Sequence, residues 1–209
     1  MNKVVRTALL AACWPTLIAT APALSAQETT REGRYYAGIL GTTINHRSVV
    51  EIIEVDDTGV RSTTDAWGSG ATLVFGKHIT DLFHVEVRAG LGLEDAELRA
   101  DQASLEIDHF ASWYIGLHYP VTSYANIFGQ FGFSYIEGEA QLNSAEAVND
   151  FPDLSQEFPG SSFSVSWLAG LDVELIGNTY LVFEAGRLFK DTETDVNAFQ
   201  FSSGLRYEF

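Results

Sequence analysis

The stretch LFHVEVRAGLGL, Leu82–Leu93, decides the fold. Apolar residues alternate there with charged, polar or glycine residues, which is the pattern of a β-strand with one apolar face. The apolar face holds Phe83, Val85, Val87, Ala89, Leu91 and Leu93. The other face holds His84, Glu86, Arg88, Gly90 and Gly92. A strand of this length suffices to cross a hydrocarbon layer when tilted, since ~9–11 residues do so.

Seven further segments show the same alternation, so the sequence predicts an all-β chain of eight antiparallel strands. Their predicted limits are about Arg34–Ile44, Ala66–Gly76, Leu105–Tyr119, Ala125–Ile136, Ser162–Leu175, Tyr180–Phe189 and Ala198–Phe209. The first is interrupted by glycine and leaves its faces ambiguous, and the segment from Tyr180 is the least regular.

The connections between these segments alternate in length. Long polar connections are predicted at Asn45–Asp65, Glu94–Ser104, Glu137–Ser161 and Lys190–Asn197. Short ones are predicted at Lys77–Asp81, Pro120–Tyr124 and Ile176–Thr179. Long loops at one end and tight turns at the other are typical of an up-and-down transmembrane barrel.

The direction of the two faces follows from aromatic and charged residues. Trp67, Trp113 and Trp167 fall on the apolar face, with Tyr119 and Tyr207 near strand ends, and such rings gather at membrane–water boundaries. The polar face combines glycine and serine with charges that predict a structural network inside a narrow barrel. The residues of this predicted network are Glu86, Arg88, Asp172, Glu174, Glu184 and Arg206. A soluble, periplasmic ligand-binding barrel remains an alternative, with the apolar face turned inward.

The first 26 residues have the pattern of a secretory signal peptide, and the barrel domain is predicted over residues 27–209. Lys3 and Arg6 precede an apolar stretch, and small residues favour cleavage after Ala26. A rival interpretation is a lipoprotein whose mature chain starts at Cys13. Cleavage after Ala26 changes the formal charge from −16 to −18, because Lys3 and Arg6 are lost with the signal. An acidic chain of this kind does not suit nucleic acid, whose binding needs a basic surface.

The residue types that carry chemistry form no recognisable site. Cys13 is the one cysteine, so the predicted mature chain has neither a disulfide nor a cysteine metal site. Four histidines are scattered without zinc-ligand spacing, namely His46, His78, His109 and His118. His84 and Glu86 lie close in sequence, but no serine is placed with them to complete a triad. We therefore predict no enzymatic activity, no cofactor and no metal.

The predicted long loops are strongly acidic, and their only basic residues are Arg47, Arg61, Arg99 and Lys190. Such loops are either a solvated surface beside anionic lipopolysaccharide or a surface for a cation or a receptor. Phe151 and Phe158 in the third long loop either contact a partner or fold back over the barrel mouth. The sequence leaves both pairs of alternatives open.

The last strand ends in a terminal aromatic residue, Phe209, after an alternating run from Phe199. With the signal peptide and the strand count, this ending makes the chain resemble small bacterial outer-membrane β-barrel proteins of the OmpA/OmpX type. The resemblance implies a cell outer-membrane location, with outer-membrane lipid and lipopolysaccharide as neighbours. It also implies that the apolar face of the last strand is read by the barrel-assembly machinery. The residues of that signal are Phe199, Phe201, Leu205, Tyr207 and Phe209.

We therefore expect a non-enzymatic, integral outer-membrane barrel with a structural or surface-interaction role and acidic extracellular loops. The sequence identifies no extracellular partner. A narrow channel or transporter for small or hydrophobic molecules is the alternative, and it requires a lining without a continuous ion-pair plug.

Overall fold

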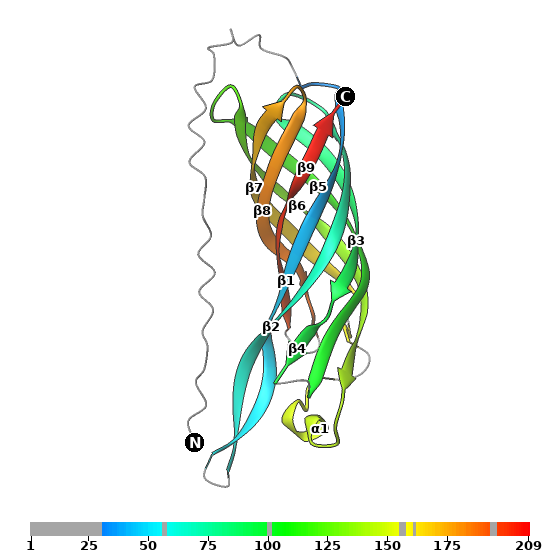
Figure 1. Cartoon of the computed structure of the whole chain (residues 1–209), viewed down its shortest axis with the longest axis vertical. Helices are drawn as coiled ribbons and strands as arrows, with labels where there is room; N and C mark the ends of the chain where they lie inside the picture. Colours follow the sequence, from blue (N-terminus) through cyan, green and yellow to red (C-terminus); the bar gives the residue numbers. More distant parts are fainter. Residues whose placement is uncertain (1–30, 56–57, 100–101, 155–157, 161, 193–195) are drawn as a thin grey trace, which may run out of the picture.

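The alternating segments form long antiparallel strands in the computed structural model (Figure 1). The structure describes residues 31–209, except 56–57, 100–101, 155–157, 161 and 193–195. The strands are β1 (Tyr35–Val55), β2 (Thr58–His78), β3 (Phe83–Glu94), β4 (Ala96–Leu98), β5 (Ala103–Pro120), β6 (Ala125–Leu142), β7 (Phe163–Ile176), β8 (Thr179–Lys190) and β9 (Asn197–Glu208). The helix α1 (Ala147–Asp150) is short, and no helix of the described residues is long and apolar enough to cross a bilayer.

The sheet closes on itself. β1 pairs with both β2 and the C-terminal β9, and β3 pairs with β5 on the far side of the barrel. β4 is a short addition that continues the edge of β5 beyond the end of β3. The eight long strands thus form an antiparallel, up-and-down barrel, and the predicted fold is confirmed.

The two ends of the barrel differ, as the predicted loop lengths require. The short connections after β2, β5 and β7 lie at the end that also holds the start of β1 and the C-terminus. By the rule that periplasmic turns are short, this is the periplasmic end, at the top in Figure 1. The long connections and α1 lie at the extracellular end.

The predicted long loop at Asn45–Asp65 is wrong, because most of it is strand. β1 and β2 each run for 21 residues, and their ladder continues from Val49↔Thr64 to Val55↔Thr58. Since β1 pairs with β9 only as far as Arg47, the ladder beyond is a two-stranded ribbon that projects from the barrel (Figure 1). Valine, isoleucine and threonine favour extended backbone there, whereas the interspersed acids gave the segment the composition of a loop.

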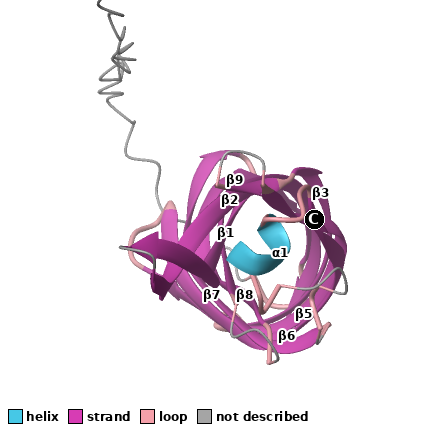
Figure 2. Ribbon diagram, turned by 90° about the horizontal axis from the view of Figure 1, so that it is seen from below, coloured by secondary structure: helices cyan, strands magenta, loops and turns pink. Residues whose placement is uncertain are grey.

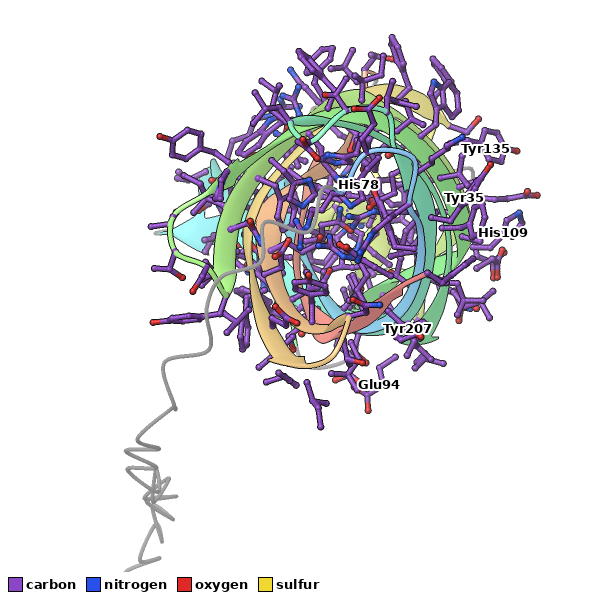
Figure 3. All side chains as sticks on the ribbon, turned by 90° about the horizontal axis from the view of Figure 1, so that it is seen from above. Tyr35, His78, Glu94, His109, Tyr135 and Tyr207 are labelled. Carbon is purple, nitrogen blue, oxygen red and sulfur yellow. The ribbon has the colours of Figure 1, made fainter. Side chains whose placement is uncertain are left out.

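The large apolar side chains cover the outside of the barrel. Trp67, Trp113 and Trp167 are 52%, 44% and 39% exposed, whereas Glu86 and Arg88 are at most 5% exposed. Seen from the periplasmic end, Tyr35, Tyr135 and Tyr207 point away from the barrel and His78 lies inside it (Figure 3). The soluble-barrel alternative is therefore wrong, since it needs the apolar face inside.

Asp108 departs from its predicted face. Alternation predicts Asp108 on the inward face of its strand, but its side chain is exposed. The pairing of β5 with β6 shifts between Ile107 and His109, and such a bulge turns the following side chains over.

Inward glycines give room to large rings from the next strand. A Cβ on Gly90 of β3 would overlap the ring of Phe110 on β5, and a Cβ on Gly76 would overlap the ring of Tyr36. A Cβ added to Gly129, on the outward face of β6, would have no other atom within 4 Å. The small residues of the polar face are therefore packing partners of the interior rings.

We predict that Gly90→Ala destabilises the barrel by about 1–3 kcal/mol, because the added methyl group forces the Phe110 ring out of its place. Gly129→Ala is the matched control and should stay within about 0.5 kcal/mol of the parent. Urea unfolding in lipid vesicles, followed by tryptophan fluorescence, measures both. Equal stability of the two variants would contradict the packing described for Gly90.

Candidate functional site

Arg88 lies at the centre of the polar half of the interior. Its guanidinium forms ion pairs with Glu86, at 2.5 Å, and with Glu184. The third nitrogen of the same group, Nη2, donates to Glu184 at 2.8 Å and to the side-chain oxygen of Gln130 at 3.1 Å. The Tyr36 hydroxyl donates to Glu86 at 2.9 Å. These residues come from four different strands, so one cation ties the barrel walls together.

A row of hydrogen bonds continues from Gln130 towards the periplasmic end. The side-chain nitrogen of Gln130 lies 2.8 Å from Nε2 of His84, and Nδ1 of His84 lies 2.8 Å from Nδ1 of His118. Nε2 of His118 lies 3.0 Å from a carboxylate oxygen of Asp172. His78 lies beside this row, with ring centroids 5.1 Å from His118 and 6.0 Å from His84.

The expectation of scattered histidines is thus wrong for His78 and His118, which meet His84 inside the barrel. Spacing along the chain could not reveal this, because each histidine comes from a different strand. Among the described residues no group of histidine, cysteine and carboxylate side chains is arranged to hold a metal ion. The other two histidines lie elsewhere: His46 is buried near Phe158, and His109 pairs with Glu137 on the outside at 3.2 Å.

Two arginines pair with carboxylates at the periplasmic end of the network. Arg206 contacts Asp172 at 2.5 Å and Glu208 at 3.7 Å. Arg31, from the segment before β1, reaches the same two carboxylates at 3.6 and 3.2 Å and stacks over the Tyr180 ring. The alternation does not predict Arg31 in the network, because this residue lies outside every alternating segment.

Five of the six residues predicted for the interior network lie in it, and Glu174 does not. Its side chain is half-buried near the periplasmic turn and makes no ion pair with a described residue. The β7–β8 ladder shifts between Glu174 and Ile176, and this irregularity takes Glu174 out of the regular inward position.

The network nearly balances its charges. Three guanidinium groups face four carboxylates, and all seven lie in the periplasmic half of the interior. The four carboxylates are Glu86, Glu184, Asp172 and Glu208. Buried charges are costly unless each has a partner, so the network is stable only as a set.

Hydroxyl groups separate this polar half from an apolar half. Thr42 bonds to Thr72 at 2.8 Å and to Ser202 at 3.1 Å. Ser112 bonds to Ser134 at 2.7 Å on the opposite wall. Beyond them lies a central cluster of apolar rings and aliphatic side chains: Ile44, Ile107, Phe110, Ile136, Leu188, Phe189 and Ala198.

The third long loop closes the extracellular mouth. Phe151, Leu154 and Phe158 are buried with Val49 and Leu98 in one apolar cluster. Figure 2 shows α1 inside the ring of strands at this end. Of the two alternatives for Phe151 and Phe158, the structure therefore has them folded back over the mouth.

A small void lies among the described residues of the polar half. A void lined by Glu86, Arg88, Glu184 and Arg206, among others, holds about 10 Å³. A void of that size has room for about one water molecule.

The predicted assembly signal lies on the outside of β9. Phe201, Leu205, Tyr207 and Phe209 are exposed, and Phe199 is partly covered by the guanidinium of Arg47. An outward, apolar last strand is compatible with recognition by an assembly factor, and that role remains a prediction.

Acidic side chains gather on the extracellular parts of β5 and β6, farther from the periplasm than the outward aromatic side chains of these strands. The pKa of Glu106 is raised, chiefly by the nearby charge of Asp95 and also by slight burial and by Asp108 and Glu139. This repulsion marks the exposed wall here as a surface with an excess of negative charge.

Comparison with known proteins identifies the family of this barrel. The sequence matches the family described as outer membrane protein beta-barrel domain over residues 11–209. No curated protein matches the sequence.

Several solved structures have a similar fold. The outer membrane protein OprG from Pseudomonas aeruginosa is 14% identical with a TM-score of 0.53, covering 86% of this chain and 97% of that one. Neisserial surface protein A, NspA, is 15% identical with a TM-score of 0.52, covering 85% and 100%. Ail of Yersinia pestis is 14% identical with a TM-score of 0.48, covering 85% and 99%. At these identities the likeness to OprG and NspA shows the fold alone.

We predict that Arg88→Met destabilises the barrel by about 3–5 kcal/mol, because two buried carboxylates lose their cation. Adding Glu184→Gln to this variant should regain part of the loss. Arg61→Met removes an exposed arginine, 3.5 Å from Asp153, and should cost under about 1 kcal/mol. Urea unfolding in lipid vesicles compares the three proteins. A loss for Arg88→Met no larger than that for Arg61→Met would contradict the central place of Arg88.

Proposed function

The chain belongs to the outer membrane protein beta-barrel domain family, and from that premise we propose that it is a closed, non-enzymatic barrel with an acidic interaction surface at its extracellular end. The family confirms the cell outer membrane as its location. The structural role and the surface-interaction role are our proposal.

The observation that carries the proposal is that side chains of the described residues occupy the interior from the periplasmic end to the extracellular mouth. Arg88, Arg206 and Arg31 pair with carboxylates through the periplasmic half. Apolar side chains and the third loop fill the extracellular half. A narrow channel needs a lining without a continuous ion-pair plug, so this interior favours the closed alternative.

The buried position of the polar groups also favours a non-enzymatic role. His118 and Asp172 make the hydrogen bond typical of an acid–base pair, but both are at most 2% exposed. A substrate would have to displace the Arg206 ion pair or the Arg31 contacts to reach them. A structural network explains these groups without a reaction.

Ion pairs hold the β1–β2 ribbon, residues 49–64, against the third long loop, and we call these two segments together the platform. Arg99 joins the β1–β2 ribbon to the third loop, with contacts to Glu51 at 3.7 Å and Asp150 at 2.8 Å. The same arginine donates to the carbonyl oxygen of Ile52 at 3.4 Å. Arg61, on the second strand of the ribbon, reaches Asp153 at 3.5 Å. A ribbon held in this way keeps its shape before a partner arrives, which lowers the entropic cost of binding.

The platform carries excess negative charge, so we infer that its partner is cationic. Residues 50–63 contain Glu51, Glu54, Asp56 and Asp57 against Arg61 alone. Replacing residues 50–63 by a tight turn removes this charge and leaves the barrel ladders intact.

We predict that bacteria displaying the full chain adhere to amine-coated glass more strongly than bacteria displaying the shortened chain. Added salt should reduce this difference, because it screens exposed charges. In planar bilayers neither protein should give steady ion conductance. Mobility shifts on boiling before electrophoresis provide the control that both proteins are folded.

Two results would contradict the proposal. Steady conductance of the full chain would show that the interior is open. Equal adhesion of the full and shortened chains would show that the ribbon does not bind cationic surfaces.

A further inference from the structure

Two arginines lie on the outer wall of the barrel on either side of one aromatic ring. Arg187 on β8 is the register partner of Phe199 on β9, and Phe199 is in turn the partner of Asn45 on β1. The Arg47 guanidinium lies over the Phe199 ring, 4.5 Å from its centroid, and its Nε donates to Asn45 at 2.5 Å. Phe199 thus holds Arg47 by a ring contact, and strand register places Arg187 beside it on the same part of the wall.

Among the residues that the structure describes, no carboxylate lies at ion-pair distance from Arg47 or Arg187. Asp65 is connected to Arg47 only through Asn45, whose side-chain nitrogen donates to Asp65 at 3.1 Å. The Nε atom of Arg187 is buried and has no hydrogen-bond acceptor. The other extracellular arginines differ, because Arg61 and Arg99 each pair with an acid. An unpaired guanidinium in a strongly acidic protein is a feature that requires an explanation.

The position of the pair points to the membrane boundary. Arg187 is the last outward residue of β8 before its ladder shifts, and Trp167 on β7 is its other register partner. Tryptophan prefers the interface, and arginine on the lipid face is costly at mid-membrane but tolerated near the interface. Towards the periplasm the same wall exposes Phe183, Phe201 and Leu205. The arginines therefore lie at the level of the lipid headgroups, and the apolar wall on their periplasmic side lies at the level of the acyl chains.

We propose that Arg47 and Arg187 form a binding site for the phosphate of a phosphorylated lipid in the outer leaflet. A guanidinium presents paired N–H donors that match phosphate oxygens, and two such groups can hold one phosphate from both sides. The Nε of Arg187 has no acceptor but is itself buried, so the phosphate meets the accessible part of this half-buried guanidinium. The acyl chains of the same lipid lie against Phe183 and Phe201.

The site is also where electrostatics allow an anionic lipid to approach. Glu106 on β5 and Glu139 on β6 lie near Asp95, which stands between β3 and β4, and these carboxylates repel phosphate. The wall formed by β8, β9 and β1 presents the arginine pair instead. A phosphorylated lipid is therefore expected at this wall and not at the acidic wall of β5 and β6.

Binding of lipid A carrying two phosphates to the detergent-solubilised full chain tests the site. Fluorescently labelled lipid A accepts energy from the tryptophans, and titration gives a Kd. The variant Arg47→Gln/Arg187→Gln should bind at least about tenfold more weakly, since charge-assisted hydrogen bonds are lost. Arg47→Lys/Arg187→Lys keeps the charge and should lose less.

Lys77→Gln is the matched control. Lys77 lies over the ring of Tyr35, 4.7 Å from its centroid, at the periplasmic end of the same barrel. It is an outward cation on an aromatic ring like Arg47, so its removal should leave the Kd unchanged.

Two further arms identify the ligand. Lipid A without phosphates should bind the parent chain weakly. Its Kd should equal that of phosphorylated lipid A for the double glutamine variant. Millimolar inorganic phosphate should not displace the labelled lipid, because it lacks the acyl chains. The proposal is overturned if the double glutamine variant keeps the parent Kd, if Lys77→Gln loses as much, if the phosphates make no difference, or if free phosphate competes. Mobility shifts on boiling verify that each variant is folded.

Discussion

The constraint on which the whole structure depends is that hydrocarbon offers no partner to a backbone N–H or C=O group. Each such group left unpaired in the membrane costs several kcal/mol, so a sheet can cross only when it has no edge. The ladder between β1 and β9 removes that edge, and the pairing of β3 with β5 completes the circuit. Once the circuit is closed with eight long strands, the interior is narrow and must be filled by side chains.

Different interactions stabilise the two halves of that interior. The periplasmic half uses charges, and because Arg88 contacts Glu86, Glu184 and Gln130, several strands share one cation. The extracellular half uses apolar packing, in which inward glycines such as Gly90 accept rings such as Phe110. The third loop extends this apolar core to the mouth. The same filling by the described residues supports the proposal that the interior is closed and that the functional surfaces are the outer wall and the extracellular platform.

Period-two alternation predicted the barrel, its closed form and the direction of its faces, because these depend on the order of apolar and polar residues within each strand. It failed where residues far apart in sequence meet. The neighbours of His78, His84 and His118 are set by strand register, which spacing along one strand does not contain. Asp108 and Glu174 left their predicted faces at local ladder shifts, and Arg31 entered the network from outside any strand. The β1–β2 ribbon was missed because the acids in its sequence resemble the composition of a loop.

The most direct test of the outward-apolar, filled barrel is spin labelling at adjacent positions of one strand. Cys13 lies in the predicted signal peptide, so single cysteines at Ser202 and Ser203, and at Ser112 and Ala111, can be labelled selectively. Collisions with oxygen, which is concentrated in lipid, and with a water-soluble nickel complex are measured in vesicles. We predict high oxygen collision rates at positions 203 and 111, and low rates with both reagents at 202 and 112. High nickel collision rates at 202 and 112 would show a water-filled interior, and high oxygen rates there would show that the faces are reversed.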